Sequence, residues 1–218
     1  MIDSHISDIK WMKRAIYLAS LGKGRTSPNP MVGAVILDKN GNLISEGFHS
    51  KSGMPHAEAM AFNNLKKDAR DGTIYVNLEP CCHQGKTPPC VDKIISFGIK
   101  KVFVSIEDPD KRVSGKGIKL LKDAGIKVHL GLCEKESQEL NKSFIHRNIT
   151  DNAFGVMKWA MSMDGRVGLK NGKSKWITNK DSRSLVHSFR ACFDAIVIGG
   201  NTLRKDDPLL TSRGIRNP

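Results

Sequence analysis

Cysteine is scarce in this chain of 218 residues, which has only five. Cys81, Cys82 and Cys90 lie close together, whereas Cys133 and Cys192 stand alone. Small secreted domains that depend on disulfides show a different pattern, with many cysteines spread evenly along the chain. The sequence therefore predicts a protein of a reducing compartment, and the cluster of three marks a candidate site.

Long apolar runs are also missing. No stretch approaches the roughly 20 apolar residues that a membrane-spanning helix needs. The first residues, Met1-Ile2-Asp3-Ser4-His5, show no basic segment followed by an apolar core, so we expect no secretory signal. Together with the reduced cysteines, these absences predict a soluble cytoplasmic protein that does not bind membranes.

Acidic residues are outnumbered by basic ones. The chain has 22 Asp and Glu against 35 Lys and Arg, a net charge of +13, and a pI near 9.6. Residues 151–218 hold 12 of the basic residues and 6 of the acidic ones, so positive charge is denser there. Such an excess suits anionic ligands, including phosphates, dinucleotides and nucleic acid. General solubility charge is the alternative explanation, and both remain open at this point.

What is present is an interrupted motif of potential metal ligands. His56-Ala57-Glu58 has the form H-x-E, and Glu79-Pro80-Cys81 is followed nine positions later by Cys90. One His and two Cys can hold Zn²⁺ and leave its fourth position open for water. In zinc deaminases the Glu is not a ligand, because it carries a proton from that water to the leaving nitrogen. The motif predicts a catalytic zinc site on His56, Cys81 and Cys90, with Glu58 as the catalytic proton carrier.

The cysteine spacing leaves alternatives. Nucleobase deaminases typically carry P-C-x-x-C, whereas eight residues separate Cys81 from Cys90 here. A short loop rich in Gly and Pro can still return Cys90 to the metal. If the residues are unrelated, they are separate thiols and an ordinary histidine. A structural zinc site would want four protein ligands and would give Glu58 no purpose.

Helices and strands alternate along the first 150 residues. Apolar residues at helical spacing predict a helix over 8–21 with Asp8 as its N-cap. An Asn-Gly turn within 38–41 predicts a hairpin. Further helices are predicted at 56–65, 91–97, 117–124 and 134–145, and strands at 32–37, 43–48, 73–78, 101–106 and 126–130. This order indicates an α/β fold, in which a mixed sheet is covered by helices and the zinc residues lie beyond strand ends.

A new series of predicted strands and helices begins near residue 150. We therefore expect one domain at 1–150 and a second region at 151–218, with strands at 156–161 and 195–198 and a helix at 181–192. The last strand runs into Gly199-Gly200-Asn201-Thr202, which could cradle a phosphate on backbone N–H groups or form a plain tight turn. No G-x-G-x-x-G motif is present, which excludes an ordinary Rossmann fingerprint.

Taken together, the motifs resemble the bifunctional deaminase/reductase family of riboflavin biosynthesis (RibD type). The similarity in the first part lies in H-A-E, E-P-C, the G-K-T-P-P-C loop of residues 85–90, residues 28–33 and Asp108-Pro109. Residues 162–166, 174–178 and 206–211 look like the start of the family's reductase domain. The resemblance covers essentially the whole chain.

This resemblance implies a cytidine-deaminase-like mixed sheet sandwiched by helices, followed by the incomplete start of a dihydrofolate-reductase-like α/β reductase domain. It implies zinc-dependent deamination of 2,5-diamino-6-(5-phosphoribosylamino)pyrimidin-4(3H)-one to 5-amino-6-(5-phosphoribosylamino)uracil. In the family, NADPH then reduces this product to 5-amino-6-(5-phosphoribitylamino)uracil. The implied cofactors are Zn²⁺ and NADPH, and the implied partners are a small phosphorylated pyrimidine and further copies of the chain in a homo-oligomer, without nucleic acid or membrane.

Roles carried over by position follow from the resemblance alone. It makes His56, Cys81 and Cys90 the zinc ligands and Glu58 the proton shuttle. The implied contacts of the deaminase substrate are Asn29, His49, Lys86, Asp108 and Asp110. The implied NADP contacts are Ala160, Trp176, Thr202 and Asp206, and the implied contacts of the reductase substrate are Ser174, Arg190, Leu210 and Arg213. Arg190 and Arg213 suit a phosphate, because a guanidinium offers paired donors. Several of these residues have ordinary structural alternatives, such as a turn at Asn29.

Three features depart from the family pattern. Cys82 stands where Ser is common, and its thiol could compete for zinc unless the backbone points adjacent side chains apart. Asp110 stands where Asn is common, and an added negative charge would not favour a phosphate. The chain ends 68 residues into the second region, so we expect a fragment or a truncated protein without reductase activity.

Two other functions suit part of the sequence. A deaminase acting on adenosine in tRNA would agree with the basic charge but not with the G-K-T-P-P loop or the second region. A non-catalytic module stabilised by zinc would have no use for Glu58. We therefore expect the riboflavin-type deaminase.

Overall fold

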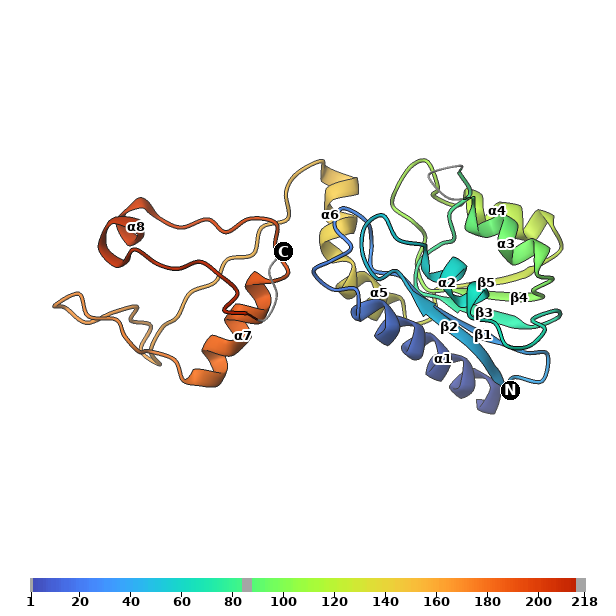
Figure 1. Ribbon diagram of the computed structural model, residues 1–218, viewed down its shortest axis with the longest axis horizontal. Coiled ribbons are helices and arrows are strands. Elements are labelled where there is room, and N and C mark those ends of the chain that lie inside the picture. The colour runs from blue at the N-terminus through green and yellow to red at the C-terminus, as the bar shows by residue number, and fades with distance from the viewer. Residues whose placement is uncertain (1, 84–87, 215–218) are drawn as a thin grey trace. The chain divides into compact units, whose positions relative to one another are not determined.

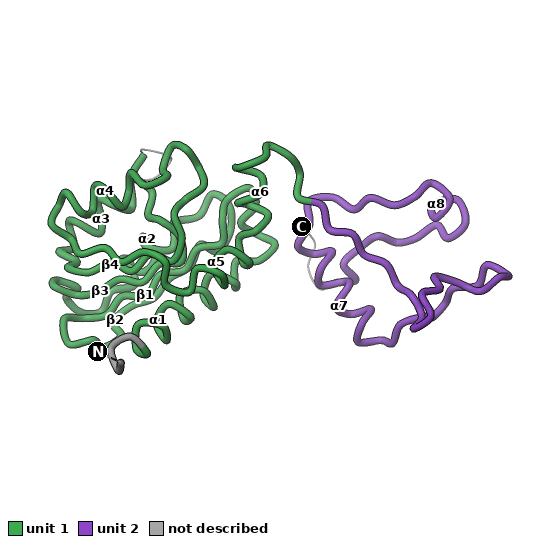
Figure 2. The backbone as a smooth tube through the Cα atoms, turned by 180° about the vertical axis from the view of Figure 1, so that it is seen from behind, with its two compact units in different colours: residues 1–154 green, residues 155–218 purple. Residues whose placement is uncertain are grey.

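The computed structural model describes residues 2–83 and 88–214 (Figure 1). It divides the chain into two compact units, Met1–Phe154 and Gly155–Pro218 (Figure 2). The predicted zinc residues all lie in the first unit. Within the described residues, no helix is both long enough and apolar enough to span a bilayer.

A five-stranded mixed sheet forms the centre of the first unit, in the order β2-β1-β3-β4-β5. β1 is antiparallel to both β2 and β3, whereas β3, β4 and β5 run parallel. The strands are β1 Gly33–Leu37, β2 Leu43–Phe48, β3 Thr73–Val76, β4 Lys101–Val104 and β5 Lys127–Leu130. The predicted hairpin and the predicted mixed sheet are confirmed.

Helices cover both faces of this sheet (Figure 1). They are α1 Ile2–Ser20, α2 Ala57–Asn63, α3 Cys90–Ser96, α4 Lys116–Asp123, α5 Glu134–Leu140 and α6 Lys142–Thr150. Side chains alternate along a strand, so Val35 and Leu37 pack with Met12 of α1 on one face. Ile36 belongs to the larger core on the other face, where α2, α3 and α4 pack. The buried residues of β1 thus contribute alternately to two apolar layers.

The N-terminal helix differs from its prediction in where it begins. α1 starts at Ile2, so Asp8 lies inside the helix and is not its N-cap. The Asp8 carboxylate instead accepts a hydrogen bond of 2.5 Å from the Tyr75 hydroxyl in β3. At Gly33 in β1, a Cβ atom would lie 2.1 Å from the Ala15 carbonyl oxygen of α1. The helix therefore packs too closely on β1 for any larger residue at that position.

The helix predicted at 134–145 is two helices, α5 and α6, which meet at Asn141. The Asn141 side chain is buried, and both of its polar ends bond the backbone of Met31. Its Oδ1 accepts from the Met31 N–H at 2.8 Å, and its Nδ2 donates to the Met31 carbonyl at 2.9 Å. These long-range bonds fix Asn141 outside helical geometry, which a local periodicity cannot reveal.

The second unit has two helices, α7 Lys180–Arg190 and α8 Gly200–Asp206, and no strand among residues 155–214. The strands predicted at 156–161 and 195–198 are therefore wrong. A strand exists only when a neighbour pairs with its backbone, and these segments have no such neighbour among the described residues. Met157 is 84% exposed and Val197 is 93% exposed. Of the described hydrophobic side chains in this unit, only that of Ala191 is buried.

We expect the second unit to be cleaved first in limited proteolysis. Segments with few buried apolar contacts open locally at little cost in free energy, and proteases of broad specificity cut such segments. Mass spectrometry of the earliest fragments should place the cuts within 155–214 and recover the sheet and helices of the first unit intact. Earliest cuts inside α1 to α6 or β1 to β5 would contradict this expectation.

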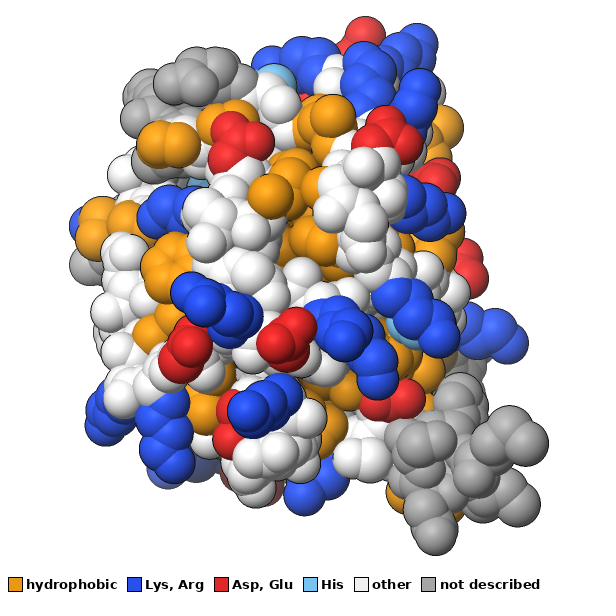
Figure 3. All heavy atoms as spheres, turned by 90° about the vertical axis from the view of Figure 1, so that its right-hand side faces the viewer, with side chains coloured by type: hydrophobic (Ala, Val, Ile, Leu, Met, Phe, Trp, Pro, Cys, Tyr) orange, Lys and Arg blue, Asp and Glu red, His pale blue; other side chains and the backbone are white. Residues whose placement is uncertain are grey.

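The charge excess is not gathered at one place on the face shown in Figure 3. Lys and Arg side chains lie there among acidic and apolar ones. A nucleic-acid surface usually shows basic residues clustered on one face or along one helix. This face shows no such cluster.

Candidate zinc centre

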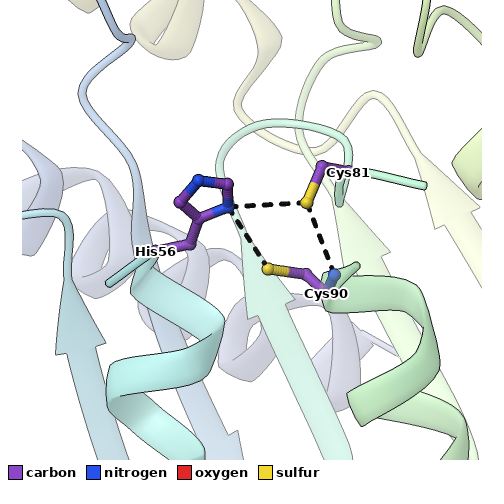
Figure 4. Close-up of side chains that lie close together, drawn as sticks. All are labelled: His56, Cys81 and Cys90. Atoms are coloured by element: carbon purple, nitrogen blue, oxygen red, sulfur yellow. Dashed lines mark hydrogen bonds between the residues drawn. The ribbon is translucent and has the colours of Figure 1, made fainter. Parts of the chain in front are cut away.

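Three potential ligand atoms converge in the first unit (Figure 4). His56 Nδ1 lies 3.4 Å from Cys81 Sγ and 3.5 Å from Cys90 Sγ, and all three atoms lie within 4.8 Å of one another. His56 is the N-cap of α2, Cys81 follows β3, and Cys90 is the first residue of α3. Three separate elements thus place a mixed nitrogen and sulfur donor set at one point.

Two hydrogen bonds bring together the ends of the segment between Cys81 and Cys90. The Cys90 N–H donates to Cys81 Sγ at 3.4 Å, and the Val91 N–H donates to the Cys81 carbonyl at 3.2 Å. These bonds join the end of the β3 segment to the start of α3. The eight intervening residues therefore do not prevent the two sulfur atoms from meeting.

The donor set fits zinc. In a tetrahedral site with Zn–S near 2.3 Å and Zn–N near 2.0 Å, a nitrogen and a sulfur ligand lie about 3.5 Å apart. The two observed nitrogen–sulfur distances match this value. A hydrogen bond with Cys90 lowers the pKa of the Cys81 thiol well below its usual range, which favours the thiolate that binds metal. Three protein ligands also leave one tetrahedral position for water.

Cys82 lies outside this donor set. Its half-buried thiol faces the Arg112 carbonyl oxygen at 4.0 Å, and burial raises its pKa. The cluster of ligand atoms found among the described residues contains His56, Cys81 and Cys90 but not Cys82. The structure therefore separates the adjacent thiols, as backbone alternation suggested.

Glu58 lies in the first turn of α2, two residues after His56. Its side chain is 3% exposed. Burial raises the pKa of Glu58 to about 7, and the negative charge of Cys81 adds to this effect. A carboxyl group with a pKa near neutrality can accept a proton and release it again.

Asn29 and His49 contact each other beside the three ligands. Asn29 Nδ2 lies 3.1 Å from His49 Nε2, and His49 Nδ1 lies 3.0 Å from the Pro55 carbonyl oxygen. Because a carbonyl can only accept, Nδ1 carries the proton and Nε2 accepts from Asn29. Burial lowers the pKa of His49, in agreement with a neutral ring. The His49 and His56 rings lie 5.9 Å apart, edge to face.

Two buried asparagines hold the segment that carries Asn29. Asn77 accepts from the Gly33 N–H at 2.8 Å and donates to the Met31 carbonyl at 3.0 Å. Asn141, which lies 110 residues later in the chain, bonds both the N–H and the carbonyl of Met31. Neither Asn77 nor Asn141 is among the residues predicted from the sequence. A polar side chain within the apolar run of 73–78 was the available signal for Asn77.

Glu79 organises the loop that follows β4. Its buried carboxylate accepts from the Asp108 N–H at 3.2 Å, the Gly115 N–H at 2.9 Å and the Ile118 N–H at 3.0 Å. A Cβ atom at Gly117 would lie 2.3 Å from the Pro80 carbonyl oxygen, so α4 begins in close contact with this segment. The Glu of the E-P-C motif therefore fixes the loop of 108–115 beside Cys81.

We expect Glu79→Gln to lower the free energy of unfolding by roughly 2 kcal/mol, because the amide turns an NH₂ group toward N–H donors and leaves hydrogen bonds unmade. Urea unfolding of the zinc-loaded protein measures this difference. Glu107→Gln changes the same chemical group at an exposed neighbouring position and serves as the control. Equal stabilities of the two variants would show that the Glu79 bonds contribute nothing.

Asp108 and Asp110 lie in this loop and differ in environment. Asp108 is buried, its Oδ1 accepts from the Asp110 N–H at 2.9 Å, and burial raises its pKa to about 6. Asp110 forms an ion pair with Arg112, which holds the pKa of its carboxyl well below the usual range. Lys86, the fifth implied contact of the deaminase substrate, lies outside the described residues.

The residues implied for the reductase lie in the second unit, and only some of them are brought together. Arg190 donates to the carbonyls of Leu209 and Thr211, each at 3.4 Å. Burial and the positive charges of Arg190, Arg213 and Arg183 lower the pKa of His187. Leu210 lies between the two carbonyl partners of Arg190.

The four implied NADP contacts do not form a site among the described residues. Ala160 lies in a segment without regular structure, as does Ser174 of the reductase substrate set, and Thr202 and Asp206 lie on the exposed α8. Trp176 is 71% exposed, with the Arg183 guanidinium 4.2 Å from its ring centre. No hydrogen bond between described residues joins any two of the four.

Comparisons with known proteins find two family matches along the chain. Residues 5–106 match the family described as cytidine and deoxycytidylate deaminase zinc-binding region, and residues 153–218 match the RibD C-terminal domain. The riboflavin biosynthesis protein RibD of Aquifex aeolicus is 47% identical over 94% of this chain. The RibD protein of Escherichia coli is 42% identical over 95% of it.

Solved structures show the same similarity. The diaminohydroxyphosphoribosylaminopyrimidine deaminase/5-amino-6-(5-phosphoribosylamino)uracil reductase of Thermotoga maritima matches 99% of this chain with a TM-score of 0.93 and 43% identity. This chain covers 62% of that structure, 58% of the Aquifex protein and 56% of the Escherichia coli protein. It therefore spans less than two thirds of these relatives. Over nearly all of its length the chain is thus similar to the RibD proteins of riboflavin biosynthesis, with a zinc-binding deaminase region followed by a region that matches the RibD C-terminal domain.

Proposed function

We propose that the first unit hydrolytically deaminates 2,5-diamino-6-(5-phosphoribosylamino)pyrimidin-4(3H)-one. The observation that carries this proposal is the convergence of His56, Cys81 and Cys90 at tetrahedral spacing beside the buried Glu58. The similar Thermotoga maritima protein is named for this deaminase activity, which supports the choice of substrate.

His56, Cys81 and Cys90 would hold the metal. Bound zinc supplies a Lewis acid that lowers the pKa of a water molecule and so makes a nucleophile available at neutral pH. With the metal bound, Glu58 would take one proton from the water, because burial raises the pKa of its carboxyl to about 7. It would pass this proton to the ring nitrogen as the oxygen adds to the adjacent ring carbon that bears the exocyclic amino group. Glu58 would then move the remaining hydroxyl proton to the amino nitrogen, so that the carbon–nitrogen bond breaks, ammonia leaves and the ring carbonyl forms.

Asn29 and His49 would orient the pyrimidine. The Nδ2 group of Asn29 has a second N–H beyond the one it gives to His49, and the ring of His49 stays neutral and fixed by Pro55. A rigid pair of this kind holds a substrate in one orientation without reorganising, and such positioning accounts for a large part of enzymatic rate enhancement. The hydrogen bonds between the Met31 backbone and the side chains of Asn77 and Asn141 hold the segment that carries Asn29 and so support the orientation of this pair.

Ammonia release from the diaminopyrimidine phosphate tests the proposal. The zinc-loaded protein should release ammonia, a strong chelator should stop the release, and added zinc should restore it. A zinc-loaded protein that releases no ammonia from this substrate would refute the proposed deaminase function.

For the second unit we propose partial reductase machinery that is inactive in the 218-residue chain. Arg190 and Arg213 would form part of a phosphate site, but Trp176, Thr202 and Asp206 are exposed and no hydrogen bond between described residues joins any two of the implied NADP contacts. Catalysis depends on reactants that are held in a fixed geometry. A segment without a buried apolar core does not hold them in this way. Incubation with the deaminated product and NADPH should leave NADPH absorbance unchanged, and steady oxidation would contradict this. A homo-oligomer remains a prediction, which light scattering can test.

A further inference from the structure

The loop after β4 places several acidic groups beside the candidate zinc centre. Glu79, Asp108 and Asp110 meet there, joined through the backbone N–H groups of Asp108 and Asp110. The Arg112 carbonyl lies 4.0 Å from the thiol of Cys82, next to the proposed ligand Cys81. These carboxylates place negative charge close to the zinc centre, and like charges would weaken the binding there of a substrate that carries a phosphate group.

Arg112 offsets the most accessible of these charges. Its Nε lies 3.0 Å from both carboxylate oxygens of Asp110, and its Nη2 lies 2.5 Å from Oδ2. The Asp110 side chain is 17% exposed and that of Arg112 is 73% exposed, so the guanidinium lies on the solvent side of the carboxylate. A paired guanidinium in this position hides the negative charge from an approaching ligand.

The backbone fixes this pair in place. The Arg112 N–H donates to Asp110 Oδ1 at 2.9 Å, which closes a tight turn. Lys116 Nζ donates to the carbonyls of Lys111 at 3.1 Å and Arg112 at 3.3 Å. The rim of the loop therefore presents the cations of Arg112 and Lys116, with the carboxylate of Asp110 beneath them.

We propose that Arg112 determines specificity for the phosphorylated substrate, because it cancels the charge of Asp110 at the entrance to the zinc centre. This inference rests on the proposed deaminase function. Arg112 acts through Asp110 and through the field at the entrance, and it takes no part in the proton transfers of Glu58. Asp110, at first sight an unfavourable replacement for Asn, thus becomes half of a pair with no net charge.

The test compares two substrates, the diaminopyrimidine phosphate and its form without the phosphate. We expect Arg112→Ala to raise KM for the phosphorylated substrate about tenfold, as two like charges within roughly 10 Å at a protein surface would require. Its kcat should change less than about twofold, and KM for the substrate without phosphate should not rise. The double variant Asp110→Asn/Arg112→Ala should lower the raised KM again by at least about threefold, because the uncompensated charge is gone.

Arg70→Ala is the matched control, since it removes another exposed arginine, which lies in the connection before β3 and outside the loop. It should leave KM for both substrates unchanged. An equal rise of KM for both substrates in Arg112→Ala, or a double variant no better than the single one, would overturn the inference. Failure of the unaltered, zinc-loaded protein to release ammonia would instead refute the deaminase function itself.

Discussion

Replacement of Glu58 by Gln is expected to abolish ammonia release while the protein keeps its full content of zinc. Loss of a general acid–base group typically costs about 100-fold to 10,000-fold in rate, and here one carboxyl serves both proton transfers. The Gln amide keeps the size and shape of the side chain but cannot accept a proton from water. Both proton transfers should therefore fail together in this variant.

The fold should tolerate this change. The buried Glu58 already has a pKa raised to about 7, because the interior disfavours its charged form. A neutral amide avoids that cost. Metal analysis of the purified variant, together with the ammonia assay, separates chemistry from binding. Glu136→Gln, at an exposed position of α5, is the control for the loss of a carboxylate. Retained turnover in Glu58→Gln, or loss of its zinc, would contradict the role of proton carrier.

The second large effect is expected at the cysteines. Cys81→Ser and Cys90→Ser should each reduce zinc from a stoichiometric amount to a trace after dialysis, and ammonia release should disappear with it. A serine hydroxyl stays protonated at neutral pH and is a poor zinc ligand. The hydrogen bond with Cys90, in contrast, lowers the pKa of the Cys81 thiol and favours its thiolate. His56 with one remaining sulfur cannot complete a three-ligand site.

Cys82→Ser provides the control that the chain itself offers, because the thiol beside Cys81 points to the Arg112 carbonyl and not to His56. It should keep zinc and activity close to those of the unaltered protein. Cys133→Ser, distant from the ligand cluster in sequence, is a second control. Equal dependence of zinc content on Cys81 and Cys82 would mean that the ligand set is wrongly assigned.

The sequence predicted the first unit well because its signals are local. The Asn-Gly turn, the alternating apolar runs and the short motifs around His56 and Cys81 each lie within a few residues. These local patterns predicted the hairpin and mixed sheet that the structure shows. The three ligand candidates chosen from the motifs are also the three that the fold brings together.

Misplaced elements trace to bonds between distant residues. Asn141 interrupts the predicted helix where it bonds Met31, 110 positions earlier. Asp8 lies inside a helix that begins at Ile2, and its carboxylate accepts from Tyr75, 67 positions later. The apolar runs of the second region resemble strands, but strand formation needs a pairing partner that local composition does not specify. The sequence alone predicts an unfavourable negative charge at Asp110, and the pairing with Arg112 changes this electrostatic effect.

The bonds from Asn141 to Met31 have a consequence for how far a minimal catalytic segment must reach. The family match to the zinc-binding region ends at residue 106, and the last strand of the sheet ends at Leu130. Yet Asn141 holds the backbone beside Asn29, and the Arg147 Nη2 group donates to the Pro28 carbonyl at 2.9 Å. A polypeptide shortened to the sheet alone would keep every proposed zinc ligand and Asn77, but it would lose the contacts of Asn141 and Arg147 with the segment that carries Asn29. A shortened polypeptide must therefore extend beyond α6. If residues 141–150 are exchanged for those of a relative, the contacts of Asn141 and Arg147 have to be preserved.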